Sequence, residues 1–387
     1  MRTTRTLLTG VMTSTIALSA AAFSAVPTYD VEVIATYETT TTVRGASDAG
    51  HVVGDQVVLG QSQPFIATLD DGLVMLPLPT GYNSGAALGV NNLGVVVGTV
   101  SDSGFAFDLG EPAIWTPDGA GGYMVAIPQQ FTTVSSPLNP NHPVSGGQAV
   151  AINDAGQIVG WSRLQGFQGG PTTQFSATGA PVNLGEAGFA ATVRDITATG
   201  IIVGGQLKMD LQTQAITDIG VPAPLGSVGF SDSIAFAVND SGEIVAAANL
   251  ASVPTENYLT YIHNDVDGFI RLNEAQLPSR FVGFYDNNNQ GDVSASGGVL
   301  FRAEDALFPG FDGLLDPSDL NWDTSLGFIG NDRRVYTTAI DINADQNAIV
   351  VLVPQSTDPP CPCDFTGDAQ VDTEDLFDLL GVWGACG

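Results

Sequence analysis

The C-terminal residues 361–387 combine the side chains that could bind a metal ion. Oxygen-bearing residues occupy positions 1, 3, 5, 7, 9 and 12 of a twelve-residue loop; they are Asp364, Thr366, Asp368, Gln370, Asp372 and Asp375. Ca²⁺ takes six to eight oxygen ligands, and a loop of this length supplies them from these positions, the seventh through its backbone carbonyl. The spacing therefore predicts Ca²⁺ as the bound ion and these six residues as its ligands. The alternative is an acidic tail that binds no metal.

All three cysteines of the 387-residue chain lie in the same stretch. Cys361 and Cys386 bracket the loop and the segment that follows it, so a disulfide between them would close about 25 residues and contribute roughly 3.5 kcal/mol in the chain-entropy model. Such a bond forms in an oxidising compartment. Cys363 is then left over. A zinc site at Cys361 and Cys363 is the alternative, and the lack of histidine in the tail argues against it.

The loop and the apolar residues after it resemble one half of a dockerin repeat. More narrowly, they resemble the Cys-flanked single-loop tails of secreted planctomycete proteins; the apolar residues are Leu376, Leu379, Leu380 and Trp383. The resemblance implies a calcium-stabilised attachment or sorting module. Two residues depart from the family pattern. Ala369 stands where the family's loop prefers Gly, at a cost of about 1–2 kcal/mol, and Thr366 replaces the usual Asp or Asn. A dockerin pairs two loops to face a cohesin, so the single loop argues against cohesin as a partner.

The N-terminus predicts export. Arg2 and Arg5 precede an acid-free apolar run over residues 7–22 that ends in small side chains, which is the pattern of a secretory signal peptide. We expect residues 1–25 to be removed and the mature protein to be secreted or held at the cell surface. No later stretch reaches the roughly 18 apolar residues of a membrane span. Residues 356–360, with the sequence STDPP, are expected to link the tail to the rest of the chain.

The charge of the chain limits its partners. There are 11 Lys and Arg residues against 41 Asp and Glu, for a formal net charge of −30. Such a surface repels phosphate backbones and anionic lipid, which argues against nucleic acid and membrane-surface partners. An extracellular polysaccharide or a surface protein remains as the expected ligand.

The segment between the signal peptide and the linker is built from a repeated phrase. The clearest copy is AVAINDAGQIVGWS at 149–162; further copies are expected at 43–54, 87–98, 193–204, 235–246, 282–295 and 339–352. Each copy predicts a β-hairpin whose turn ends in a residue of positive φ, Gly in six copies and Asn347 in the seventh. A second strand, turn, strand phrase lies between successive copies, at 64–78, 112–127, 173–184, 207–219 and 258–272. Two hairpins per repeat give four strands.

Four strands every 42 to 62 residues, without helix-period segments, predict an all-β fold, a seven-bladed β-propeller over residues 26–355. A solenoid of hairpins is the alternative, but no capping repeat is evident. The strand at 29–38 stands alone before the first copy and is expected to complete the last blade and close the ring. The phrase A-x-x-I-N-x-x-G-x-I-V-G resembles the HAF repeats, probable extracellular repeats of secreted bacterial proteins. That resemblance implies an extracellular propeller and no particular activity.

The residues available for catalysis are sparse. His51, His142 and His263 are each expected in a turn or loop, and no Ser or Cys lies in a nucleophile motif. The acidic pairs Asp70/Asp71, Asp265/Asp267 and Asp316/Asp319 are expected to form turns or caps. Two functional classes remain: a non-catalytic binding protein, which we favour, and a carbohydrate-active enzyme, namely a polysaccharide hydrolase or lyase. Carboxylates that converge in the propeller's channel beside aromatic residues would favour the enzyme.

Overall fold

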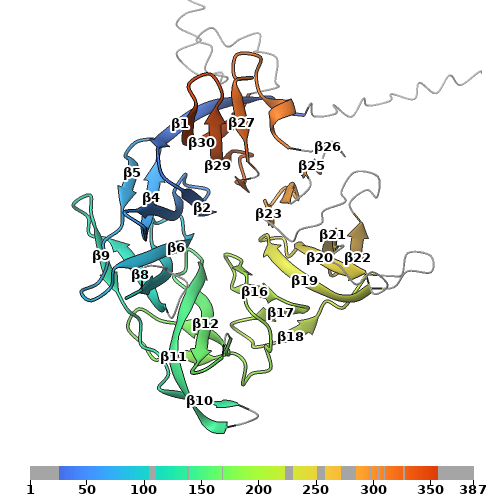
Figure 1. Cartoon of the computed structure of the whole chain (residues 1–387). Helices are drawn as coiled ribbons and strands as arrows, with labels where there is room; N and C mark the ends of the chain where they lie inside the picture. The colour runs from blue at the N-terminus through green and yellow to red at the C-terminus, as the bar shows by residue number, and fades with distance from the viewer. Residues whose placement is uncertain are drawn as a thin grey trace, which may run out of the picture.

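The chain folds as a seven-bladed β-propeller (Figure 1). The computed structural model describes residues 26–355 except 104–109, 137–138, 168, 223–229, 251–257, 272–284, 296–297, 303–305, 309 and 326. The predicted signal peptide (residues 1–25), the linker (356–360) and the calcium-binding tail (361–387) lie outside the described residues. The predicted fold class and blade number are confirmed.

Within each blade neighbouring strands pair antiparallel, and four strands follow one another outward from the axis. In blade 3 the additional strand β10 (Thr133–Ser136) pairs with the start of β11 (Asn139–Ile152) and lies toward the rim (Figure 1). Blades 1 to 3 comprise β2 (Thr41–Ala46), β3 (Val52–Val58), β4 (Gln61–Thr68) and β5 (Gly72–Met75); β6 (Ser84–Val90), β7 (Val96–Ser101), β8 (Glu111–Pro117) and β9 (Tyr123–Ala126); and β10 (Thr133–Ser136), β11 (Asn139–Ile152), β12 (Ile158–Leu164), β13 (Thr172–Phe175) and β14 (Val182–Asn183). Blades 4 to 6 comprise β15 (Asp195–Ile196), β16 (Ile201–Gly204), β17 (Leu207–Asp210) and β18 (Ile216–Asp218); β19 (Phe230–Val238), β20 (Ile244–Leu250), β21 (Tyr258–Asn264) and β22 (Gly268–Arg271); and β23 (Tyr285–Asn287), β24 (Val293–Ala295), β25 (Gly298–Phe301) and β26 (Ala306–Phe308).

The seventh blade joins the two ends of the described chain. Its inner position is shared by β27 (Trp322–Thr324) and β28 (Phe328–Ile329), which both pair with β29 (Val335–Asp341); β30 (Gln346–Pro354) follows. The outermost strand is β1 (Tyr29–Tyr37), which pairs antiparallel with β30 from Tyr29 opposite Pro354 to Tyr37 opposite Asn347. The prediction that the N-terminal strand closes the ring is therefore confirmed.

The inner hairpin turns confirm six of the seven predicted copies and correct the last. Gly50, Gly94, Gly156, Gly200, Gly242 and Gly291 all have positive φ, between 72° and 88°. In blade 7 the corresponding turn lies between β28 and β29, and its positive-φ residue is Arg333, at φ 65°. The segment 339–352, with Asn347, instead forms the next hairpin outward, between β29 and β30. The prediction was wrong because an arginine gives no sequence signal for a left-handed turn.

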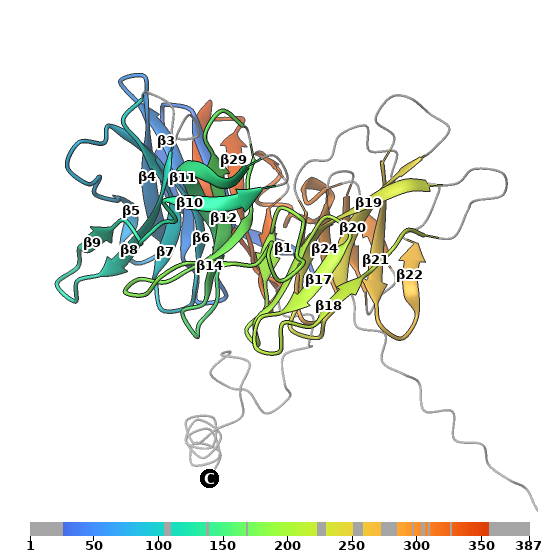
Figure 2. The ribbon, with the colours of Figure 1, turned by 90° about the horizontal axis from the view of Figure 1, so that it is seen from below.

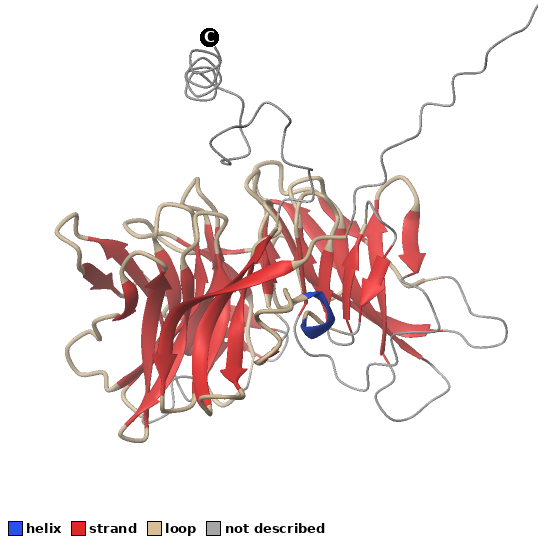
Figure 3. Cartoon of the chain, turned by 90° about the horizontal axis from the view of Figure 1, so that it is seen from above, coloured by secondary structure: helices blue, strands red, loops and turns tan. Residues whose placement is uncertain are grey.

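Apolar side chains fill the spaces between blades. Between blades 1 and 2, for example, Ile66, Val96 and Trp115 belong to one buried cluster, and the indole Nε1 of Trp115 donates to the carbonyl of Pro77 at 2.7 Å. The 3₁₀ helix η1 (Asp312–Leu314) is the only helix among the described residues (Figure 3), and no described helix is long and apolar enough to cross a membrane.

The inner hairpin turns distinguish one face of the propeller from the other. Each first strand runs toward its inner hairpin turn, so these seven turns lie on one face, which we call the turn-ring face. Figure 2 shows the ring edge-on. The hydroxyl of Tyr29 donates to the carbonyl of Arg333, in the seventh turn, at 3.1 Å. Because Tyr29 also pairs with Pro354, both ends of the described chain lie on the turn-ring face.

Candidate functional site

The inner hairpin turns are joined in a closed circle of hydrogen bonds around the axis. A backbone N–H of one turn donates to a side-chain oxygen of the next; these links are Ala49 to Asn92 (2.9 Å), Asn92 to Asp154 (2.8 Å), Ala198 to Asp240 (2.7 Å), Asp240 to Asn289 (2.8 Å), Asn289 to Asn331 (2.7 Å) and Asn331 to Asp48 (2.8 Å). Between blades 3 and 4, Nδ2 of Asn153 donates to the carbonyl of Thr197 at 3.0 Å. The Asn and Asp residues of the repeated phrase thus hold the blades together.

The first polar residue of the repeated phrase also caps its own turn. Oδ1 of Asn153 accepts the N–H of Gln157, within its own turn, at 3.0 Å. Oδ1 of Asn239 accepts the N–H of Glu243 in the same way at 2.9 Å, while its Nδ2 donates to the carbonyl of Asn288 in the next blade at 2.8 Å. One amide side chain therefore caps its own turn and binds the neighbouring blade, which explains the Asn of the phrase without any ligand.

A channel runs along the axis inside this circle. It consists of a cavity of about 240 Å³ at the turn-ring face and a cavity of about 590 Å³ below it. Asp195 of β15 and Asp286 of β23 line both cavities and so mark their junction. At the same position of their strands the other blades carry Gly45, Gly89, Ala151, Ala237 and Phe328. The larger cavity lies within the volume range of small-molecule sites, about 300–1,000 Å³.

The two junction aspartates are held by the following blades and have raised pKa values. Oδ2 of Asp195 accepts the N–H of Val238 at 2.8 Å, and Oδ2 of Asp286 accepts the N–H of Ile329 at 2.8 Å. Burial raises the pKa of Asp195 to about 6. Burial, followed by the negative charge of Asp195, raises the pKa of Asp286 well above its usual value. Burial and mutual repulsion thus favour the protonated form of both carboxyl groups more than water does.

The larger cavity adds basic and aromatic groups toward the opposite face. Its wall includes Arg44, Gln148, Trp161, Arg194 and Phe236. Arg44 is engaged in an ion pair with Asp55. Arg194 is exposed, and its guanidinium carbon lies 5.7 Å from the centre of the Phe236 ring. Hydrogen-bond donors, hydrogen-bond acceptors and aromatic rings thus line the same cavity.

Of the sequence-predicted candidates, His51, His142 and His263 lie among the described residues, and none of the three lines the channel. The six calcium ligands and the cysteines Cys361 and Cys386 lie outside the described residues. His142 and His263 lie in strands β11 and β21, not in turns. His263 is 8% exposed and packs against Phe269 at 4.8 Å. Among the residues that the structure describes, no three His, Cys, Asp or Glu side chains are grouped so as to hold a metal ion.

His51 has a serine partner that sequence reasoning missed. Oγ of Ser47 and Nδ1 of His51 are 3.1 Å apart, and burial lowers the pKa of His51. Ser47 occupies the turn position at which the other blades carry capping residues such as Asn91 and Thr197, whose side chains accept N–H groups of their own turns. In the first turn the hydroxyl of Ser47 thus contacts the side chain of the residue four positions later, where Asn91 and Thr197 accept the backbone N–H of the residue four positions later.

This geometry defines a closed β-propeller with a polar axial channel. No family model matches the chain, and no curated protein is similar to it. Among solved structures, a puromycin hydrolase mutant in complex with PGG is 13% identical and aligns over 85% of this chain and 55% of its own, with a TM-score of 0.48. TolB from Acinetobacter baumannii (9% identity, 82% and 55% coverage, TM-score 0.31) and YCF48 in complex with a peptide (13%, 87% and 100%, 0.31) are also similar. The chain spans about half the length of the first two, and we draw no functional conclusion from these distant similarities.

Proposed function

We propose that this chain is an exported, non-catalytic binding protein that takes a carbohydrate in the axial channel of its propeller. The observation that carries the proposal is the mixed lining of the larger cavity. Carbohydrates present hydroxyl groups that donate and accept together with apolar C–H faces. The channel offers acceptors at Asp195 and Asp286, a donor at Arg194 and aromatic surface at Trp161.

The rigidity of the junction supports binding. Asp195 and Asp286 each accept a backbone N–H from the next blade, so their carboxyl groups are positioned before any ligand arrives. Preorganised polar groups lose less conformational entropy when a ligand binds. Among the described residues that line the two cavities there is no His, Lys or Cys.

Export and attachment complete the proposal. The signal-peptide pattern of residues 1–25, together with the resemblance to extracellular HAF repeats, supports secretion or display at the cell surface. The loop from Asp364 to Asp375 is proposed to bind Ca²⁺ and to stabilise, with a Cys361–Cys386 disulfide, a module for attachment or sorting.

A carbohydrate-active enzyme is the second candidate, and the junction aspartates favour it. Glycoside hydrolysis uses two carboxyl groups, one with a raised pKa that donates a proton and one ionised. Asp195 and Asp286 are near enough for one charge to raise the pKa of the other. In that reading the channel binds and also cleaves the sugar chain.

The test measures binding and cleavage on one panel of soluble glycans. The panel holds neutral dextran and laminarin, carboxylated alginate and cationic chitosan, and the readouts are retardation in affinity electrophoresis and release of reducing ends. A binding protein retards a neutral glycan without releasing reducing ends. An enzyme releases them, and both Asp195→Asn and Asp286→Asn abolish the release. Failure to retard any member of the panel would contradict the proposal.

A further inference from the structure

A second cavity opens beside the channel, between blades 4 and 5. Its volume is about 490 Å³, and its lining includes Thr192, Gln206, Asp218 and Asp232. Gln206 lies in the turn between β16 and β17, and Asp232 lies near the start of β19, so the cavity opens on the face opposite the turn ring. Below, we call it the side cleft.

The side cleft is continuous with the channel. Thr192 and Arg194 line both the side cleft and the larger axial cavity. The first strand of blade 4, β15, has only two residues, and Thr192 and Arg194 belong to the segment just before it, where the backbone N–H of Arg194 donates to the carbonyl of Val203 in β16 at 2.8 Å. Short first strands also occur in blade 6 (β23, three residues) and blade 7 (β28, two residues). The continuity of the two spaces therefore rests on the lining residues that they share, Thr192 and Arg194.

Arg194 stands at the junction of the two spaces with its charge available. Its guanidinium forms no ion pair with the residues that the structure describes, and its carbon atom Cζ lies 5.7 Å from the centre of the Phe236 ring. A planar guanidinium carries five N–H donors, so it can donate hydrogen bonds to a ligand group in the channel and to another in the side cleft at the same time. Within the side cleft, Asp218 and Asp232 add acceptors and Gln206 adds both kinds of group.

We infer that the ligand is a linear, hydroxyl-rich oligomer that extends from the channel through the side cleft, with Arg194 between successive units. This inference rests on the proposed function, since it specifies the length and path of the carbohydrate. A compact ligand would occupy the axial cavity alone. An oligosaccharide chain fills both cavities and leaves between blades 4 and 5.

The experiment titrates the oligomers, from one to six units, of whichever neutral panel glycan binds, by isothermal calorimetry. The variant under test carries Gln206→Ala and Asp232→Ala, two residues of the side cleft. The control carries Gln212→Ala and Asp267→Ala, exposed turn residues of the same two blades on the turn-ring face. Thermal melting of each variant establishes that it is folded.

For the wild type and the control, affinity rises by about tenfold or more from the shortest oligomer that binds to the longest. The cleft variant binds the shortest oligomer as the wild type does and loses most of the gain with length. Wild-type affinity that is independent of length, or a gain that persists in the cleft variant, would overturn the inference while the proposed function stands. Absence of binding for every oligomer and its parent polymer would contradict the proposed function itself.

Discussion

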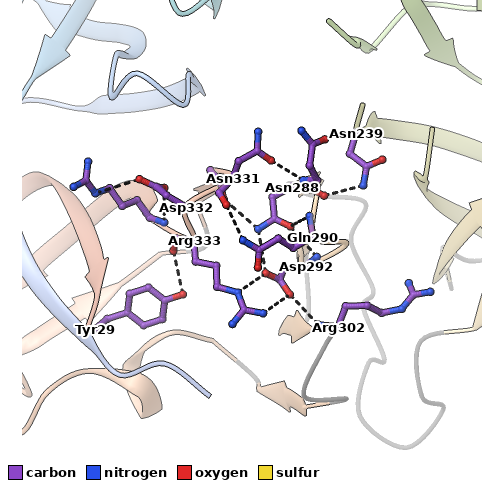
Figure 4. Close-up of polar contacts among 12 residues, drawn as sticks. Tyr29, Asn239, Asn288, Gln290, Asp292, Arg302, Asn331, Asp332 and Arg333 are labelled. Carbon is purple, nitrogen blue, oxygen red and sulfur yellow. Dashed lines mark hydrogen bonds and ion pairs between the residues drawn. The ribbon is translucent and has the colours of Figure 1, made fainter. Parts of the chain in front are cut away.

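Arg333 of blade 7 forms a buried ion pair with Asp292 of blade 6: its Nε donates to Oδ2 at 2.9 Å, and its Nη2 lies 3.3 Å from Oδ1 (Figure 4). Asp292 is fully buried, and its Oδ1 also accepts the N–H of Arg302 at 2.9 Å. The backbone carbonyl of Arg333 accepts the hydroxyl of Tyr29 from the N-terminal strand. One residue thus ties blade 6, blade 7 and the closing strand together, which explains why an arginine occupies a turn position where glycine is easier.

Removing this arginine should destabilise the propeller. Arg333→Ala leaves the buried Asp292 carboxylate without its cationic partner, so we expect the free energy of unfolding to fall by about 3–5 kcal/mol in urea melts. Arg334→Ala is the matched control, because its pair with Asp332 is roughly half exposed on both sides and should contribute at most about 1 kcal/mol. Equal losses in the two variants would contradict the role given to Arg333.

Tyr29 tests the closure of the ring. Its ring is fully buried in the core of blade 7 and packs against Phe311 at 5.8 Å. Tyr29→Ala should lower the free energy of unfolding by about 3–5 kcal/mol, as other buried aromatic truncations do. Tyr29→Phe keeps the ring, removes the hydroxyl that donates to the carbonyl of Arg333 and should cost about 1 kcal/mol. A Tyr29→Ala protein that melts like the wild type would show that β1 does not close the fold.

The raised pKa of Asp195 predicts a pH dependence of stability. The folded-state pKa is about 6, above the ordinary value of 3.8 for an aspartate, so the folded state binds the proton more tightly than the unfolded state. Its contribution is full below about pH 4 and is lost as pH rises through 6, for a total of about 3 kcal/mol. Asp195→Asn cannot ionise, so its stability relative to the wild type should increase between pH 4.5 and pH 7.5.

The Asp118→Asn protein is the control, because its stability relative to the wild type should change with pH in the opposite direction. The N–H groups of Ala120 and Gly122 lower the pKa of Asp118, so that carboxylate stabilises the fold above the unfolded-state pKa. The Asp118→Asn protein should therefore lose stability relative to the wild type as pH rises from 3 to 5. If the stability of the Asp195→Asn protein relative to the wild type stays constant from pH 4.5 to pH 7.5, the carboxyl group of Asp195 does not have the raised pKa described above.

The propeller was predictable because its signals are local. Each phrase carries its own turn glycine and its own capping Asn, so the hairpins and the closing strand follow from short stretches of sequence. The sequence prediction assigned the seventh turn to the wrong residues because Arg333 adopts positive φ there. The strain of that conformation is offset by the ion pair with Asp292, 41 residues earlier. No local pattern reveals such a pair.

The channel aspartates left a signal that sequence analysis did not use. In VRDITATG and FYDNNNQG an Asp stands where copies such as AVAINDAG and AFAVNDSG have Ala. A charge at a position of small residues marks a distinct environment. Both strands line the axial channel only because the ring closes. Neither this meeting nor the side cleft between blades 4 and 5 could be derived from either copy alone.

The calcium prediction concerns the tail. We expect the wild-type protein, with the proposed Cys361–Cys386 disulfide formed, to bind one Ca²⁺ in calorimetric titrations at millimolar concentration, since the four ligand carboxylates of the loop repel one another without the ion. Asp364→Ala, which removes the first ligand, should abolish the heat of binding while the melting of the propeller stays unchanged. If titration of the wild-type protein with Ca²⁺ gives no heat of binding, the tail is acidic but binds no calcium.

The central claim, that the ligand lies on the propeller axis, is tested most directly by filling the channel. Val150 is half-buried in the wall of the larger cavity, whereas Val182 lies 43% exposed on the outermost strand of the same blade. The measurement is a calorimetric titration of the bound panel glycan into Val150→Trp and Val182→Trp, each first shown to melt cooperatively. The account predicts that Val150→Trp loses binding by about a hundredfold or more and that Val182→Trp retains wild-type affinity. Undiminished affinity in the Val150→Trp protein would place the ligand elsewhere and contradict the account.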